Sequence, residues 1–293
     1  MALCQLILKR PLLVVQRGST NIGSATSSSY TIVSADAGST IRCVVTATNS
    51  LGAVSANSNN SSAVPSIGQQ AYTSSGSYTW VAPAGVSSVA IVAVGGGSNG
   101  GGGLGYKNSQ AVTAGSSYTV VVGAGAVNRS GAGNDSYFIS TSVVKGGGGV
   151  NNGTGGSYVG TGGGNGGTGQ YGGGGAGGYS GNGGSGGDNG SGTAGNGGGG
   201  GGGSWDDSGG GGVRTSQPNQ AGYGGSGGAN GLMSLSWPNG YGNPPATRDC
   251  SGGAYGGGHG LYGNSTQGDG GVGAVRIIWG TNRSFPSTNT GDL

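Results

Sequence analysis

The chain has few charged residues and no glutamate. Lysine and arginine together number 11, acidic residues number 8, and only 6% of the 293 residues are charged. Binding to phosphate or nucleic acid requires clustered basic side chains, and a net charge of +3 spread over this length does not supply a cluster. We therefore expect no nucleic-acid partner, and few carboxylates are available for acid–base chemistry.

Histidine and cysteine are equally scarce. The single histidine, His259, lies among glycines with no acidic residue at a useful spacing, and we interpret it as a loop residue without a catalytic role. General acid–base and nucleophilic catalysis both require a positioned base and a group that orients it. Cys4, Cys43 and Cys250 form no CxxC pair, so reduced thiols are expected. We predict no enzymatic activity, no cofactor and no metal site.

No apolar run is long enough to cross a membrane. At the start of the chain, MALCQLILKRPLLVV places a short apolar run before Lys9 and Arg10, which reverses the charge order of a signal peptide. We expect a protein that is made in a cytoplasm, is not inserted into a membrane, and is exported, if at all, by lysis or assembly.

Glycine, by contrast, is abundant, with 80 residues. Over one stretch it occupies every third position without exception. The members of this series are Gly160, Gly163, Gly166, Gly169, Gly172, Gly175, Gly178, Gly181, Gly184, Gly187 and Gly190. A strict period of three indicates an extended helix with three residues per turn, one face of which has no side chains.

Three kinds of structure are compatible with many glycines at this spacing. Collagen relies on abundant proline, and the chain has none between Pro83 and Pro218. A disordered linker is compatible with glycine and proline at about 30% of the chain, but low-complexity disorder has no period. The period therefore favours a layered polyglycine II array: left-handed extended helices joined by N–H to C=O bonds. Side chains such as Ala176, Tyr179 and Asn182 are expected on an outer face.

Residues 1–65 are expected to form short strands. The segments QRGSTNI, SSYTIV, TIRCVVTATN and GAVSANS are rich in β-branched residues and separated by glycine, serine and asparagine turns. This rhythm is typical of a β-sandwich.

One pattern in this region resembles the last strands of an immunoglobulin-like repeat of bacteria or phages: Asp36, Gly38, Ile41 and Cys43. The early strands of such a repeat are missing, and Val14 and Val15 stand where its buried tryptophan is expected. The resemblance implies a partial or variant module used for attachment or spacing. It also places Cys4 at a distance from Cys43 compatible with a disulfide.

Residues 66–145 are predicted to be a second β unit that supplies the hydrophobic core. A hairpin-like pair is expected, with Pro83 and Gly85 at its bend and a buried strand over 86–94. Residues 273–293 contain the apolar segment GAVRIIWG, which we expect to pair back onto this unit, and then a polar tail.

The segment GGGSNG at 95–100 matches the GxGxxG of dinucleotide sites only by its letters. Such a site requires a helix after the glycines and an acidic residue about 20 positions later, and the first acidic residue that follows is Asp135. We discount the match, and no segment has a helical period. The predicted fold is all-β with polyglycine II, with sandwich-like framing strands and no α-helix.

Residues 146–272 are predicted to be the glycine array, interrupted by richer segments at 204–208, 213–221, 232–250 and 261–267. About 31 residues of straight polyglycine II would span roughly 95 Å, so a compact domain must fold the chain back. We expect these four segments, hereafter the islands, to be the reversals.

The islands combine tyrosine and tryptophan with small polar residues and arginine, the mixture that adaptable binding loops use. Tyrosine and tryptophan could instead cover the ends of the glycine layers, as expected for Tyr158, Tyr171 and Tyr179 inside the repeat. The adjacent carboxylates of Asp206 and Asp207 could bind a metal, but it is more usual for such a pair to be solvated or to accept hydrogen bonds from backbone N–H groups. The candidate binding residues are Trp205, Asp206, Asp207, Arg214, Trp237, Tyr241, Arg248 and Tyr262.

Three segments together resemble the glycine-rich terminal domain of bacteriophage tail fibres: GSYTWVAPAGVSSVAIVAVGGG, AVTAGSSYTVVVGAGA and GAVRIIWG. The end, AVRIIWGTNRSFPSTNT, is similar to tail-fibre proteins of marine phages that infect cyanobacteria. Similarity to T-even-type adhesins implies a virion protein, made in the host cytoplasm, whose loops between glycine helices bind a host cell-surface protein or glycan. Other tail-fibre or virion proteins would be partners, and a homo-oligomer is left open.

Two other functions compete with that of an adhesin. A structural protein could polymerise through its glycine face into a fibre, which would make assembly depend on concentration. A carbohydrate-processing enzyme of a phage spike is disfavoured by the absence of glutamate and by only 8 acidic residues.

Overall fold

The computed structural model describes residues 11–128, 130–187, 192–196, 251–260 and 268–286. Over these ranges the chain is all-β, with strands β1 to β14 in three antiparallel sheets. The helical content of these residues is one three-residue 3-10 turn, η1 (Ser34–Asp36). The expectation of an all-β chain without α-helix is therefore confirmed for the described residues.

The N-terminal sheet has the strand order β2-β1-β3-β4. Its strands are β1 (Leu12–Arg17), β2 (Thr20–Asn21), β3 (Ile41–Asn49) and β4 (Gly52–Asn57). Strand β4 is exposed along its whole length. The prediction of a strand over SSYTIV is wrong, because residues 28–33 lie in the connection between β2 and β3. Cys43 is a free thiol, and Cys4 lies outside the described residues.

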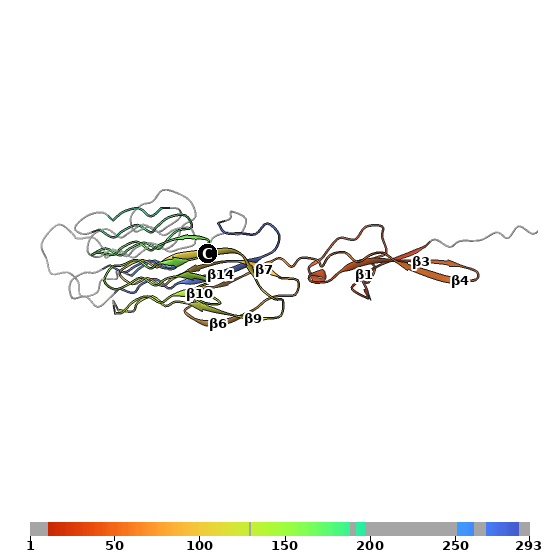
Figure 1. The fold of residues 1–293 in the computed structure, drawn as a ribbon, viewed down its shortest axis with the longest axis horizontal. Helices are drawn as coiled ribbons and strands as arrows, with labels where there is room; N and C mark the ends of the chain where they lie inside the picture. The colour runs from red at the N-terminus through yellow and green to blue at the C-terminus, as the bar shows by residue number, and fades with distance from the viewer. Residues whose placement is uncertain (1–10, 129, 188–191, 197–250, 261–267, 287–293) are drawn as a thin grey trace, which may run out of the picture.

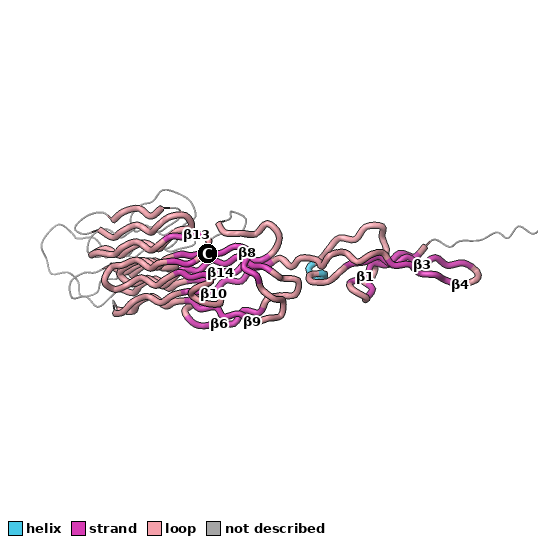
Figure 2. The backbone as a smooth tube through the Cα atoms, in the orientation of Figure 1, coloured by secondary structure: helices cyan, strands magenta, loops and turns pink. Residues whose placement is uncertain are grey.

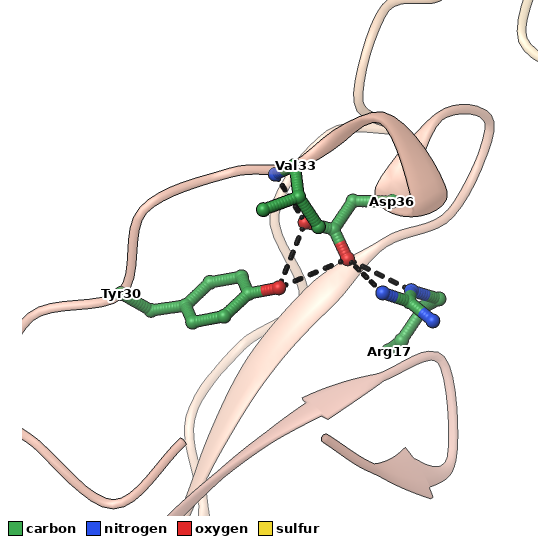
Figure 3. Close-up of polar contacts among 4 residues, drawn as sticks. All are labelled: Arg17, Tyr30, Val33 and Asp36. Atoms are coloured by element: carbon green, nitrogen blue, oxygen red, sulfur yellow. Dashed lines mark hydrogen bonds and ion pairs between the residues drawn. The ribbon is translucent and has the colours of Figure 1, made fainter. Parts of the chain in front are cut away.

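A buried carboxylate fixes that connection, as Figure 3 shows. The side chain of Asp36 is fully buried and accepts hydrogen bonds from Val33 N (2.8 Å), Tyr30 Oη (3.0 Å) and Arg17 Nε (2.8 Å). The Val33 N–H, followed by Arg17 and Tyr30, holds the pKa of Asp36 below its ordinary value although burial opposes this. Burial and the neighbouring Asp36 raise the pKa of Tyr30. The polar cluster thus replaces strand pairing in this loop.

Two further sheets of five strands each form the body of the molecule, with orders β13-β8-β7-β14-β5 and β12-β11-β10-β9-β6. The strands of the first are β5 (Gly68–Tyr72), β7 (Ser88–Val94), β8 (Leu104–Ala111), β13 (Gly162–Gly164) and β14 (Ala274–Trp279). Those of the second are β6 (Gly76–Val81), β9 (Ser117–Val122), β10 (Ser136–Phe138), β11 (Val144–Gly146) and β12 (Tyr158–Val159).

The main hydrophobic core contains residues from both of these sheets. Trp80 of β6 and Phe138 of β10 meet edge to face with ring centroids 5.8 Å apart, and Trp80 also contacts Trp279 of β14. Ile91 of β7 and Ile277 of β14 belong to the same cluster and have no exposed surface. This region supplies the ordinary core expected of residues 66–145, with β14 added to it.

The opposite face of β7 and β14 is also buried. There Val92, Val94 and Ile278 pack with Ala176 and with the aromatic pair Tyr179 and Phe285. Apolar side chains on both faces explain why β7 reads as an uninterrupted apolar run rather than as an alternating one.

Strand pairing confirms one expectation and corrects another. Strand β14 pairs with β7 and β5, as expected for a closing strand, and lies between them. The hairpin expected around Pro83 and Gly85 does not form, because β6 pairs with β9 in one sheet and β7 with β8 in the other. The segment 82–87 therefore connects the two sheets. Local turn signals identify a bend but not the partner of the next strand.

The molecule is elongated (Figures 1 and 2). The N-terminal sheet lies at one end, and the strands of the body are continued at the other end by segments without regular strand structure, drawn as loops in Figure 2. These segments contain the glycines.

Candidate functional site

The hairpin of residues 95–103, which connects β7 to β8, lies at the centre of the glycine segments. The first limb donates three consecutive N–H groups to three different neighbours: Gly95 to Gly103 O (3.0 Å), Gly96 to Asn134 O (3.0 Å) and Gly97 to Gly271 O (2.8 Å). The second limb does the same: Gly101 to Gly167 O (3.0 Å), Gly102 to Gly256 O (2.7 Å) and Gly103 to Gly147 O (2.8 Å). A β-strand directs its donors alternately to two sides, so this pattern is not a sheet ladder.

Neighbouring backbones leave no room for side chains along this hairpin. A Cβ added at Gly96, Gly97 or Gly101 would lie within 3.0 Å of a backbone carbonyl oxygen, that of Ala124, Gly257 or Gly175 respectively. These glycines are thus required by the closeness of other backbones. We extend the name glycine array from the predicted range 146–272 to all glycine segments packed in this way, including residues 95–103.

The periodic stretch that begins at Gly160 adds layers to the array and folds back within its own period. Bends occur at 170–172 and at 179–181. Across the first bend, Gly167 N donates to Gly175 O (2.7 Å). Across the second bend, Gly175 N donates to Gly184 O (2.8 Å). The expectation that reversals occur at the islands is wrong for this stretch. Of the predicted glycine series, Gly190 lies outside the described residues.

The third residues of the triplets do not share one outer face. Asn182 is exposed, as expected, whereas Ala176 is fully buried and Tyr179 is 5% exposed. Ala176 and Tyr179 face the sheet that contains β7, and Tyr179 stacks on Phe285 with a centroid distance of 6.0 Å. The segment 172–178 is therefore sandwiched between the sheet and the next glycine layer. Among the tyrosines expected to cover glycine layers, Tyr158 and Tyr171 are exposed.

Two polar residues at the tip of the central hairpin tie several segments together. Asn99 is 1% exposed and donates from its side-chain Nδ2 to Gln170 O (3.0 Å) and His259 O (3.1 Å). Its backbone carbonyl oxygen accepts from Gly174 N (2.9 Å). Ser98 is also buried, and its hydroxyl donates to Gly131 O (2.8 Å). Buried polar groups are generally hydrogen-bonded in folded proteins. By bonding to Gly131, Gln170 and His259, the two side chains hold the segments that contain these residues against the tip of the hairpin.

Sequence reasoning missed Ser98 and Asn99, since it treated GGGSNG only as a discounted nucleotide motif. The available signal was that these two residues alone interrupt glycine between Val94 and Leu104. His259 lies in a segment without regular secondary structure, as expected of a loop residue. Its side chain is fully buried, and its backbone N donates to Ser98 O (2.6 Å).

The described ends of the island-bearing segments are anchored on the array. Asn196 N donates to Asn182 O (2.8 Å). Further along the chain, Gly252 N donates to Asp269 O (2.7 Å), Asp269 N donates to Ser251 Oγ (3.0 Å), and Asn128 N donates to Asp269 Oδ1 (2.7 Å). Residues 251 and 252, where one described range begins, therefore lie beside residue 269, near the start of the next range.

All the candidate binding residues of the islands lie outside the described residues: Trp205, Asp206, Asp207, Arg214, Trp237, Tyr241, Arg248 and Tyr262. They stay predictions. Geometry identifies the array and the fixed ends from which these segments depart.

The part of the chain that the structure describes contains no group of three histidine, cysteine or acidic residues able to hold a metal. Its three aspartates all have partners: Asp36 is bonded to Arg17, Asp135 lies 3.3 Å from Lys145, and Asp269 bonds Asn128 N. No helix within the described ranges is long and apolar enough to span a membrane.

Comparison with known proteins gives no assignment. No protein-family model matches the chain, and no curated protein matches it. The features that bear on function are therefore the glycine array, the anchored segment ends and the sequence of the islands.

Proposed function

We propose that the glycine array is a polyglycine II structure mounted on a β-sandwich. The observation that supports it is the distribution of three consecutive donors to three neighbours in both limbs of the central hairpin. Three residues per turn place successive N–H groups about 120° apart, which a polyglycine II helix satisfies and a flat sheet does not. The two five-stranded sheets, which share one hydrophobic core, would be the sandwich.

On this scaffold we propose the function of a distal adhesin of a phage tail fibre, which binds a host cell-surface receptor through the islands. An array held by backbone hydrogen bonds does not depend on the side chains of its connecting loops, so those loops can vary while the scaffold stays rigid. The anchored ends at Asn196, Ser251 and Asp269 support this division between scaffold and loops. The aromatic and arginine content of the islands suits a binding surface.

Adsorption to cells tests the proposal. The labelled protein is incubated with a panel of marine cyanobacterial strains, and a strain that binds it is used to compare variants. Trp237→Ala and Arg248→Ala are expected to reduce adsorption by about tenfold each without changing the melting temperature. Gln70→Ala, on exposed strand β5, is the control. Equal adsorption of wild type and a variant with residues 232–250 replaced by a glycine–serine linker would exclude that island from the site.

Self-assembly into a fibre through the glycine face remains the second candidate, and one observation argues against it. The outer layer of the array carries exposed Thr168 and Asn182 side chains, and Thr168 Oγ1 donates to Ser185 Oγ (2.9 Å). Side chains on the outer layer would block the backbone contact that another glycine layer requires. A sedimentation coefficient that rises with protein concentration would favour assembly.

A further inference from the structure

A cleft at the other end of the body is independent of the glycine array. It lies between the start of β7, the end of β14, residues 108–109 of β8 and the loop 280–284, and Pro65 and Ser66 also line it. Its volume is about 620 Å³, within the range of about 300 to 1,000 Å³ that small-molecule sites occupy. Nothing in the proposed adhesin function uses this cleft.

The cleft combines an apolar floor with a polar rim. Ala90 and Ile278, which are buried on the same face of their sheet, form the floor. The rim carries hydroxyl and amide side chains that are exposed: Ser87, Ser88, Ser109, Thr281, Asn282 and Ser284. Among the residues that the structure describes, no acidic residue lines the cleft and Arg283 is its one charged residue.

Hydrogen bonds hold the walls in place without a ligand. Asn108 donates from Nδ2 to Phe285 O (2.7 Å) and accepts from Phe285 N (2.9 Å), which fastens the loop 280–284 to β8. Arg283 donates to Gly68 O and to Gln69 Oε1 (2.8 Å). The cleft is therefore largely preformed, as binding sites usually are.

Its chemistry selects a class of ligand. Arg283 donates to two neutral oxygens, and no carboxylate of the described part of the chain lines the cleft beside it. A guanidinium with spare N–H groups binds carboxylates well. Rim hydroxyls and amides suit a ligand with many hydroxyl groups, and the apolar floor suits the C–H faces of sugar rings.

We propose that this cleft binds a short oligosaccharide that carries a carboxylate, with the carboxylate at Arg283. The site is a second one, at the end of the body away from the glycine array, and it does not depend on the adhesin proposal.

Titration calorimetry with tetragalacturonate, and with maltotetraose as the neutral probe, tests the assignment on the full chain. Wild type is expected to bind the acidic probe at least about tenfold more tightly than the neutral one, the difference that one charge-assisted contact supplies. Ser87→Trp places a large side chain at the rim and is expected to abolish binding. Ser117→Trp, a matched substitution at an exposed serine of β9, is expected to leave the Kd unchanged.

Arg283→Lys keeps the positive charge and Arg283→Gln removes it. Only Arg283→Gln is therefore expected to bind tetragalacturonate and maltotetraose with equal affinity. The location of the bound probe is checked by the shifts of the Ser109 and Asn282 amide NMR signals when tetragalacturonate is added. This measurement uses the wild-type chain, so it does not depend on the folding of a variant. Absence of saturable binding at millimolar probe, equal binding of both probes, or full binding by Ser87→Trp would overturn the proposal. Cell adsorption by Ser87→Trp is expected to match wild type, so the two proposals fail separately.

Discussion

Strand β7 and the hairpin that follows it are continuous in the chain but exclude water by opposite means. In β7, Ile91 and Val92 fill space on both faces of a sheet with branched side chains. In the hairpin, Gly96 and Gly101 are equally buried with no side chain, because backbones of other segments lie where a Cβ would be. The hydrophobic effect stabilises the first region, whereas the second depends on satisfying nearly every backbone donor and acceptor.

This difference predicts opposite responses to a change of side-chain size. A core tolerates conservative changes and is destabilised when volume is removed. An array of touching backbones has no volume to lose and is destabilised when volume is added.

The largest effect is expected from truncation in the core. Phe138→Ala removes a fully buried ring that contacts Trp80 and Tyr118, and we expect a loss of about 3 to 5 kcal/mol in the free energy of unfolding. Chemical denaturation followed by tryptophan fluorescence measures it. A loss below about 1 kcal/mol would show that the ring does not belong to a close-packed core.

The next largest effect is expected from the reverse change in the array. Gly101→Val places a branched side chain against the backbone of Gly175, and overpacking of this kind costs about 1 to 3 kcal/mol. Gly23→Ala is the control, because nothing lies within 4 Å of its added Cβ. The melting temperature distinguishes them, and an unchanged value for Gly101→Val would contradict the packed array.

The smallest effect is expected in the N-terminal sheet, which relies on a polar cluster instead. The pKa of Asp36 is lowered on folding, so its stabilisation is present above the unfolded pKa of about 3.9 and is lost as pH falls through the folded value. The pKa of Tyr30 is raised, so its contribution is present below about 10 and is lost as pH rises through the folded value. The protection factors of the β1 amides, which correct for the intrinsic pH dependence of exchange, should therefore fall at both extremes.

Asp36→Asn is the control for this profile. It is expected to lower the protection of β1 at neutral pH, to remove the dependence at low pH, and only to weaken that at high pH, because burial also raises the pKa of Tyr30, while β7 keeps wild-type protection. An unchanged profile in the variant would assign the dependence to other groups.

The glycine array was predictable only in part. The glycine period indicated side-by-side packing, and each glycine of the central hairpin is indeed enclosed by other backbones. The interruption of glycine marks Ser98 and Asn99 in the sequence, but their hydrogen-bond partners could not be predicted, because these lie 33 to 160 residues away. Ala176 and Asn182 occupy equivalent triplet positions yet differ in burial, since only Ala176 faces a sheet.

By itself the sequence determined that the chain is all-β over its described residues, that β7 and β14 are buried strands, and where bare backbone can be packed. These properties follow from local patterns of apolar residues and glycine. Only the tertiary structure decided that β6 pairs with β9, that the periodic stretch reverses inside its own repeat, and that Asp36 anchors a loop. Those outcomes depend on which distant segments become neighbours, and a glycine segment has no side chains that could specify its neighbour in advance.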